Sequence, residues 1–244
     1  MTDILRVGHI DLGFHDASAR VVEQILRDHG HPIARSAAPH EAMFKRLGRG
    51  EIDMLVSAWL PASHGGYLAP MRDAVEAITV LYEPYCIWGV PAYVPEDQVA
   101  AVPDLTRPAV LERMTGRIQG INPGAGISRF SARMIDAYGL AQHGYAFHTG
   151  SQEDCFSTFE RAVAEGRWVI VPLWQPQWLH ARHAIRALAE PLGLLGGTDK
   201  ATLIVRKDAL PSIAPAALTA LRALHLGNAA VSRLDLARHL EEGY

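Results

Sequence analysis

The sequence has little cysteine and no long hydrophobic run. Cys86 and Cys155 are the two cysteines among 244 residues, in unrelated apolar surroundings, so a disulfide framework is excluded. The remaining alternatives are a single bridge, which nothing in the sequence supports, and two free thiols. We expect both to be buried free thiols, because unpaired cysteine is commonly buried. No window approaches the roughly eighteen consecutive apolar residues that a membrane span needs, so we expect no insertion into a membrane.

A strong imbalance of charge is also lacking. The chain has 23 Lys and Arg against 26 Asp and Glu, which gives a formal net charge of −3. Nucleic acids and anionic membranes attract strongly basic proteins, so neither is an expected partner. The apolar content of 49% is ordinary for a globular protein, and the length fits one large domain or two joined lobes.

Motifs for catalysis and for metal binding are missing. His29 and His31 lie in a Gly/Pro turn, and His180-x-x-His183 has no third ligand at a telling distance. The sequence contains no Gly-x-Ser-x-Gly elbow and no nucleophile beside a base. An enzyme is therefore the weakest interpretation, and we expect no catalytic residue, no metal and no cofactor.

A secretory signal is missing from the sequence as written. The start, Met1-Thr2-Asp3-Ile4-Leu5-Arg6, has no basic segment followed by an apolar one. We therefore expect that the chain stays inside the cell, that a signal has been removed, or that the sequence is one domain of a longer polypeptide.

Strand and helix patterns alternate along the chain, and this predicts an α/β protein with parallel sheets flanked by helices. The expected strands are 4–10, 54–58, 76–82, 85–90, 117–121, 145–148, 168–173 and 201–206. The expected helices are 17–29, 40–48, 104–114, 126–139, 152–165, 211–226 and 228–241. Four prolines between Pro91 and Pro108 mark a crossing into a second lobe. We expect residues 1–89 plus 198–244 to form lobe 1 and residues 90–197 to form lobe 2.

Two phrases place a tryptophan where a strand pattern ends: Trp59-Leu60-Pro61-Ala62-Ser63-His64 and Trp174-Gln175-Pro176-Gln177-Trp178. Open α/β sheets bind ligands at the carboxyl ends of their strands. Indole faces attract poorly hydrated cations, above all quaternary ammonium. We therefore predict that Trp59 and Trp174, one from each lobe, enclose a small methylated amine in a cleft between the lobes.

A strand-to-helix turn, Asn122-Pro123-Gly124-Ala125-Gly126, offers backbone N–H groups at a helix start. It is either a binding site for an anion of carboxylate size or a tight structural turn. His64 either donates to the same carboxylate from the other lobe or bonds to a neighbouring carbonyl.

With these residues in place, the chain resembles the substrate-binding proteins of glycine betaine/proline betaine/choline ABC transporters. The resemblance is carried, in order, by Gly50-Glu51-Ile52-Asp53, Trp59-Leu60-Pro61-x-x-His64-x-x-Tyr67, Val90-Pro91-x-Tyr93-Val94, Gly120-Ile121-Asn122-Pro123-Gly124-Ala125-Gly126-Ile127 and Trp174-x-Pro176-x-Trp178. Membership implies a periplasmic-binding-protein fold of the second type, with two α/β lobes, a two-strand hinge and a ligand held between the lobes.

The resemblance also implies roles for individual residues. Trp59 and Trp174 match two walls of an aromatic cage for trimethylammonium. The side chain of His64 and the backbone N–H groups of Gly126 and Ile127 match a carboxylate clamp.

Two departures from the family pattern bear on the choice of ligand. Leu12 stands where relatives often have a third cage tryptophan, with Phe14 nearby as a substitute and Asp11 as a negative charge that favours choline. Gln177 replaces a histidine that is common in relatives.

The function implied is delivery of a small betaine-type or choline-like solute to an ABC transporter permease by a monomeric binding protein. Its location is then periplasmic or at the transporter. The alternative from another class is a ligand-sensing regulatory domain on the same fold, not coupled to transport.

Overall fold

The computed structural model describes residues 4–241, and the chain forms two compact units. Unit 1 comprises Met1–Pro84, Pro176–Trp178 and Asp199–Tyr244, and unit 2 comprises Tyr85–Gln175 and Leu179–Thr198. The expected lobe boundary between residues 89 and 90 falls inside β5 (Tyr85–Pro91), which belongs wholly to unit 2. The expected boundary at residue 198 lies beside the observed one, between Thr198 and Asp199.

Unit 1 is built on one five-stranded mixed sheet. The strand order is β2 (Ile33–Ala38), β1 (Leu5–Ile10), β3 (Met54–Leu60), β10 (Lys200–Arg206) and β4 (Val75–Tyr82). β1 runs parallel to both β2 and β3, whereas β10 runs antiparallel to both β3 and β4. The carboxyl ends of β1 and β3 therefore meet at the same edge of the sheet.

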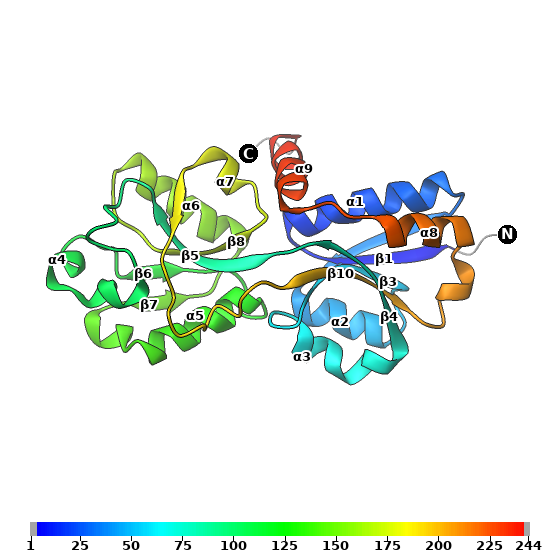
Figure 1. The fold of residues 1–244 in the computed structure, drawn as a ribbon, viewed down its shortest axis with the longest axis horizontal. Coiled ribbons are helices and arrows are strands. Elements are labelled where there is room, and N and C mark those ends of the chain that lie inside the picture. The colour runs from blue at the N-terminus through cyan, green and yellow to red at the C-terminus, as the bar shows by residue number, and fades with distance from the viewer. Residues whose placement is uncertain (1–3, 242–244) are drawn as a thin grey trace. The chain divides into compact units, whose positions relative to one another are not determined.

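Helices cover both faces of this sheet (Figure 1). One face carries α1 (Gly13–Asp28) and α8 (Pro215–Ala223), and the other carries α2 (His40–Gly48) and the short α3 (Gly65–Leu68). The last helix, α9 (Asn228–Glu241), packs against α1. The core beneath α2 is made of aliphatic and aromatic side chains, among them Ile10, Met43, Phe44, Leu47, Ile52 and Leu55.

Unit 2 contains two smaller sheets. β5 lies between β8 (Val171–Gln175) and β9 (Ile185–Ala187) and is antiparallel to both, whereas β6 (Arg117–Gln119) and β7 (Ala146–His148) are parallel. The helices are α4 (Pro108–Leu111), α5 (Gly126–Ala137), α6 (Gln152–Ala164) and α7 (Leu179–Arg182). α6 and α5 lie on opposite sides of the β5 sheet (Figure 1).

The predicted alternation of strands and helices is confirmed, with corrections in detail. β2 and β9 escaped prediction; β2 reads Ile-Ala-Arg-Ser-Ala-Ala, which has little of the β-branched and aromatic content that marks strands. Helix α1 begins at Gly13 and not at residue 17. The predicted helix 104–114 is a 3₁₀ turn over Val102–Thr106 followed by α4.

The expectation of mainly parallel sheets is confirmed for unit 1, where β1, β2, β3 and β4 run in one direction. The antiparallel pairs involve the strands at which the chain enters a new unit. β5 and β10 each arrive from the other unit and not through a strand–helix–strand connection. Only that connection obliges neighbouring strands to run parallel. Both crossing strands are antiparallel to the strands beside them.

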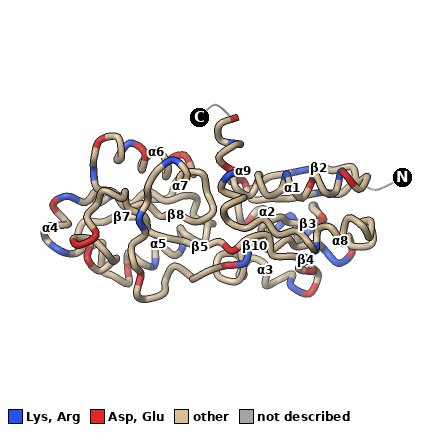
Figure 2. The backbone as a smooth tube through the Cα atoms, turned by 45° about the horizontal axis from the view of Figure 1, so that its top comes forward, with Lys and Arg blue, Asp and Glu red and all other residues tan. Residues whose placement is uncertain are grey.

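Surface and thiol features agree with the composition. Cys86 and Cys155 are buried free cysteines, as predicted. Lys and Arg are interspersed with Asp and Glu along both units (Figure 2). Within residues 4–241, no helix combines the length and apolarity of a membrane span, and no group of three or more His, Cys, Asp or Glu side chains is arranged to hold a metal ion.

Candidate ligand-binding residues in the two units

Trp59 lies within β3 and not in the turn after it. The strand continues to Leu60 because Trp59 pairs with Ala201, and Leu60 with Lys200, of β10. The side chain is 5% exposed, and its Nε1–H donates to the Tyr82 hydroxyl at 3.1 Å. The expectation that the strand ends at residue 58, before Trp59, is therefore wrong, and the ring has a fixed orientation inside unit 1.

A β-bulge in β3 sets the direction of this tryptophan. Residues 56 and 57 together face Leu203 of β10, and Ser57 has a left-handed backbone with φ of 66°. A serine rarely adopts this conformation, and bulges commonly redirect a strand beside a functional site. The Ser57 hydroxyl also hydrogen bonds to the Tyr82 hydroxyl, so the bulge and Trp59 share one anchor.

Burial raises the pKa of the Tyr82 hydroxyl well above its ordinary value, although its hydrogen bonds to Ser57 and Trp59 oppose the shift. Tyr82 therefore stays a neutral phenol. It provides a fixed polar end to an otherwise aromatic cluster.

His64 is fixed by the backbone of Trp59. Its Nδ1 accepts a hydrogen bond from the Trp59 N–H at 2.9 Å, and its own N–H donates to the Trp59 carbonyl at 2.8 Å. Nδ1 is an acceptor only when it carries no proton, so the neutral ring carries its proton on Nε2. The partner of His64 Nδ1 is thus a backbone N–H and not the neighbouring carbonyl expected as one of the two alternatives.

Three candidates at the start of α1 have different surroundings. Phe14 is buried, and its ring centroid lies 5.2 Å from that of Trp59 with a 38° tilt. Leu12 is partly buried and packs against the core cluster beneath α2. Asp11 is exposed. Of the three, Phe14 is the residue that the structure brings to Trp59.

His15 is a residue that sequence reasoning missed. It is 1% exposed, and its ring centroid lies 5.7 Å from Trp59 and 6.3 Å from His64. Burial lowers its pKa well below the usual value, and His64, His40 and His9 lower it further. His15 is therefore neutral. His15 directly follows Phe14 in the sequence. It was missed because the helix was expected to begin at residue 17, whereas α1 begins at Gly13 and includes His15.

We expect the free energy of unfolding to fall as the pH drops below about 6.5, the ordinary pKa of histidine. There the unfolded chain binds a proton at His15 and the folded chain does not, so acid favours unfolding. One such proton changes the unfolding free energy by up to about 1.4 kcal/mol per pH unit. In urea titrations from pH 5 to 7.5, His15→Phe should flatten the pH dependence of the free energy of unfolding.

The exposed His143 provides the control, because His143→Gln should leave this pH dependence unchanged. The same pH dependence in wild type and in His15→Phe would contradict the role assigned to His15.

In unit 2, Trp174 lies within β8, where it pairs with Cys86 of β5. Its side chain is 1% exposed and lies against Phe156 of α6, with ring centroids 5.6 Å apart and a 35° tilt. The expectation that Trp174 follows its strand is also wrong. β8 spans Val171–Gln175 and not residues 168–173.

The start of α5 matches the predicted position, since the helix begins at Gly126. Its N-cap residue is Ala125, whose methyl group cannot accept a hydrogen bond from the first turn. Gly126 and Ile127 are buried. Backbone N–H groups in a first helical turn have no acceptor within the helix, so those of Gly126 and Ile127 suit an anion.

Residues 176–178 belong to unit 1 by their contacts. Trp178 stacks on His239 of α9, with ring centroids 3.8 Å apart and a 13° tilt, and its N–H donates to the Asp235 carboxylate at 2.9 Å. Gln177 is fully buried, and no group within residues 4–241 hydrogen bonds to its side-chain amide. An amide without a protein partner can serve a polar group on a ligand.

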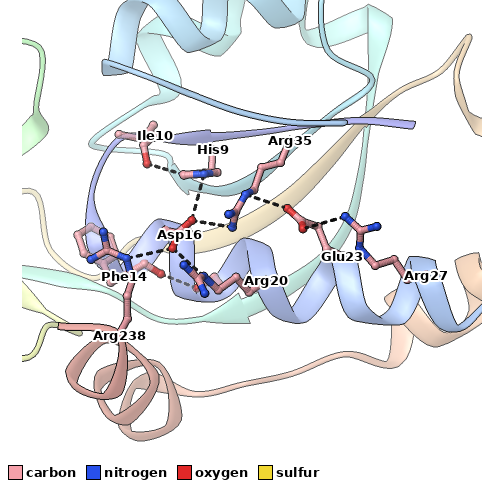
Figure 3. A network of polar contacts seen from close by, with 10 residues as sticks. His9, Ile10, Phe14, Asp16, Arg20, Glu23, Arg27, Arg35 and Arg238 are labelled. Carbon is pink, nitrogen blue, oxygen red and sulfur yellow. Dashed lines mark hydrogen bonds and ion pairs between the residues drawn. The ribbon is translucent and has the colours of Figure 1, made fainter. Parts of the chain in front are cut away.

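α9 is held against α1 by a carboxylate that the sequence did not reveal (Figure 3). Asp16, in the first turn of α1, accepts hydrogen bonds from Arg20 Nε at 2.9 Å, Arg35 Nη1 at 2.7 Å and Arg238 Nε at 3.0 Å. His9 Nε2 lies 3.4 Å from the same carboxylate. One side chain thus joins β1, α1, β2 and α9. Through α9 it supports Asp235 and Trp178.

The sequence as a whole matches one family model, described as the substrate-binding domain of ABC-type glycine betaine transport systems (OpuAC), over residues 3–243. A curated relative, the glycine betaine/carnitine transport binding protein GbuC of Listeria monocytogenes serotype 1/2a (strain 10403S), is 29% identical over 96 residues. That alignment covers 39% of this chain and 32% of GbuC, so the matched segment spans about a third of the relative's length.

Solved structures agree in fold. Lactococcal OpuAC, in a closed form complexed with glycine betaine, has a TM-score of 0.84 at 22% identity, covering 99% of this chain and 91% of that one. Borrelia burgdorferi ProX has a TM-score of 0.86 at 22% identity, covering 99% and 89%. A choline-binding protein of an ABC transporter, in complex with choline, has a TM-score of 0.81 at 18% identity, covering 99% and 84%. The predicted type 2 periplasmic-binding-protein fold is confirmed.

The family match also decides between the classes of function considered from the sequence. The matching model describes a binding domain and not an enzyme, so the prediction that the chain is not an enzyme is confirmed. It describes a component of a transport system, and the regulatory alternative gains no support from it.

Proposed function

Because the chain belongs to the family of substrate-binding domains of ABC-type glycine betaine transport systems, we propose that it binds a small quaternary ammonium solute for delivery to an ABC transporter. The candidate solutes are glycine betaine, proline betaine, choline and compounds like them. The residue sets of both units take part in binding.

The observation that carries this proposal is the pairing of Trp59 with Phe14 beside a histidine of fixed tautomer. Aromatic faces attract a cation that cannot hydrogen bond, and this preference excludes well-hydrated ammonium. The Nε2–H of His64 donates to the carboxylate of a betaine, whereas choline offers it only the neutral oxygen of a hydroxyl group, a weaker acceptor. Phe14 takes the role of a third aromatic wall, which the leucine at position 12 does not provide.

Unit 2 contributes the same two kinds of chemistry. Trp174, supported by Phe156, offers a second indole face, and the start of α5 offers the N–H groups of Gly126 and Ile127 to the carboxylate. A micromolar ligand needs about 8 kcal/mol. The proposed site provides two desolvated cation–π contacts of about 2 kcal/mol each. It also provides three charge-assisted hydrogen bonds of about 1.5–3 kcal/mol each, and together these contacts are sufficient for micromolar affinity.

Asp11 and Gln177 widen the range of solutes that we propose. Asp11 is an exposed negative charge beside the start of α1, and it favours a cation without a carboxylate. The buried amide of Gln177 can accept a hydrogen bond from an alcohol or donate one to a carboxylate. Binding of both choline and betaines is therefore expected.

His64→Ala tests the proposed clamp. We expect its affinity for glycine betaine to fall about tenfold or more, because one charge-assisted hydrogen bond of about 1.5–3 kcal/mol is lost. Affinity for choline should change less than about threefold, since choline has no carboxylate for His64 to bind. Calorimetric titration of both ligands into wild type and variant measures the difference. Equal losses for the two ligands remove His64 from the clamp.

For the partner and the location, the family match supports association with an ABC transporter. We propose that the partner is the permease and that the protein acts, as a monomer, on the side of the membrane from which solute is taken up. Uptake of labelled glycine betaine by vesicles that carry the transporter, with and without this protein, tests the proposal. Uptake that does not depend on the protein would exclude a transport role.

A further inference from the structure

Asp199 occupies the junction where the chain leaves and re-enters unit 1. It is the first residue of the last segment of that unit, directly before β10. Its N–H donates to the carbonyl of Pro84 at 2.8 Å, and Pro84 is the last residue of the first segment. The end of the first segment of unit 1 and the start of its last segment are thus joined to each other at Asp199.

The side chain of Asp199 reaches from this junction to the loop after β3. Its Oδ1 accepts the N–H of Ala62 at 2.7 Å, and its Oδ2 accepts the N–H of Ser63 at 3.0 Å. The residue is only 3% exposed. A buried carboxylate is costly unless hydrogen bonds satisfy it, and the backbone N–H groups of this loop provide those hydrogen bonds.

The loop that Asp199 holds connects two of the proposed binding residues. Residues 60–63 link Trp59, which lies in β3, to His64. The backbone of Trp59 is also joined to the backbone and to the imidazole of His64 by the two hydrogen bonds already described. The Gly65 N–H donates to the Pro61 carbonyl at 3.1 Å and so closes the loop from its other side. A change in the position of Ala62 or Ser63 therefore moves the His64 ring relative to the indole of Trp59.

We infer that Asp199 is a positioning residue for ligand binding. Its carboxylate fixes the loop between Trp59 and His64, and it ties that loop to the junction between the two crossing segments of unit 1. The inference rests on the proposed function where it is tested by ligand affinity. The NMR measurement of the His64 tautomer in ligand-free protein does not depend on that function. Asp199 acts through the loop and touches no ligand in this scheme.

Asp199→Asn in the full chain is the direct test. An asparagine side chain offers one acceptor and one NH₂ donor, so one of the two loop N–H groups faces another donor and the loop shifts. In ligand-free protein, ¹⁵N-edited NMR should show the Nε2–H tautomer of His64 in wild type and a mixture of tautomers in the variant. The affinity for glycine betaine should fall at least tenfold.

Asp53→Asn is the matched control, because it makes the same substitution at a buried aspartate directly before β3, at the end of that strand remote from the loop that Asp199 binds. Asp53 is 7% exposed and accepts the backbone N–H of Arg6 at 2.7 Å. The Asp53→Asn variant should be less stable than the wild type, but it should keep the His64 tautomer and the wild-type affinity for glycine betaine. If Asp199→Asn does not fold, Asp199→Ser, which retains one acceptor oxygen, is measured in the same way.

The outcomes separate the two proposals. A wild-type tautomer and wild-type affinity in Asp199→Asn would overturn the positioning role, and so would equal changes in Asp53→Asn. A wild-type protein that binds none of the quaternary ammonium compounds would overturn the proposed function. In that event the His64 spectrum of the ligand-free protein still decides the role of Asp199.

Discussion

Trp59→Ala is expected to lower the affinity for glycine betaine at least tenfold, and Trp174→Ala is expected to do the same. Each substitution removes an aromatic face, worth about 2 kcal/mol toward a desolvated cation, which corresponds to a factor of about thirty. Trp59→Ala also leaves the Tyr82 hydroxyl without its indole donor. Calorimetric titration measures the losses.

The controls for this prediction separate binding from folding. Replacing a buried tryptophan by alanine costs about 3–5 kcal/mol of stability, so affinities are compared at a temperature where circular dichroism shows all variants folded. Trp168 of unit 2 is equally buried, and Arg113 lies over its ring at 3.9 Å. Trp168→Phe should leave affinity unchanged, whereas Trp59→Phe should lose a smaller part of it than Trp59→Ala. Retained affinity in both alanine variants would exclude the aromatic cage.

Asp16→Ala is expected to lower the free energy of unfolding by about 3 kcal/mol. Removing one partner of a buried ion pair costs about 3–5 kcal/mol, and the partial exposure of Arg20, Arg35 and Arg238 places this case at the lower end. Urea denaturation measures the loss. Because Arg238 then no longer holds α9 against α1, we also expect faster hydrogen exchange in α9 than elsewhere in unit 1.

The pH dependence of stability gives a second measurement at this site. Burial raises the pKa of Asp16, but Arg20, Arg35 and His9 together lower it more, so the net shift is downward. A carboxyl whose pKa is lowered on folding stabilises the protein above its ordinary pKa near 4, and this contribution is lost as the pH falls through the folded-state value. Asp16→Ala should lack this acid-dependent loss.

Glu41 is the matched control for Asp16. It pairs with Lys45 on the surface of α2 at 2.7 Å, and both side chains are 60% exposed. Glu41→Ala should cost less than about 0.5 kcal/mol. A loss for Asp16→Ala as small as that would mean that α9 is held by its apolar contacts and not by the carboxylate.

Much of the fold followed from local patterns in the sequence. Apolar periodicity and Gly/Pro signals located most helices, and several motifs in order identified the family and the fold. The pattern did not reveal β2, because its short side chains carry little strand preference. It also could not give the direction of the crossing strands, which depends on pairing between distant segments.

The candidate site was predictable in its residue types more than in its geometry. Trp59 and His64 were found because a tryptophan at a strand end is unusual. Their mutual hydrogen bonds depend on the bulge at Ser57, and a one-residue bulge leaves no reliable trace in a pattern. Asp199 and Asp16 were missed because a single aspartate gives no sequence signal until distant segments bring donors to it.

The central place of β10 in its sheet has a consequence for synthesis of the chain. β10 is the neighbour of both β3 and β4, yet about 140 residues separate Leu60 from Lys200. At roughly 5–20 residues per second, the ribosome needs about 7–28 s to supply them. During that interval the nascent β3 and β4 have exposed edges, which are prone to pairing with other chains. Unit 2, made entirely of the intervening segment, can therefore complete its folding before unit 1 has all the strands of its sheet.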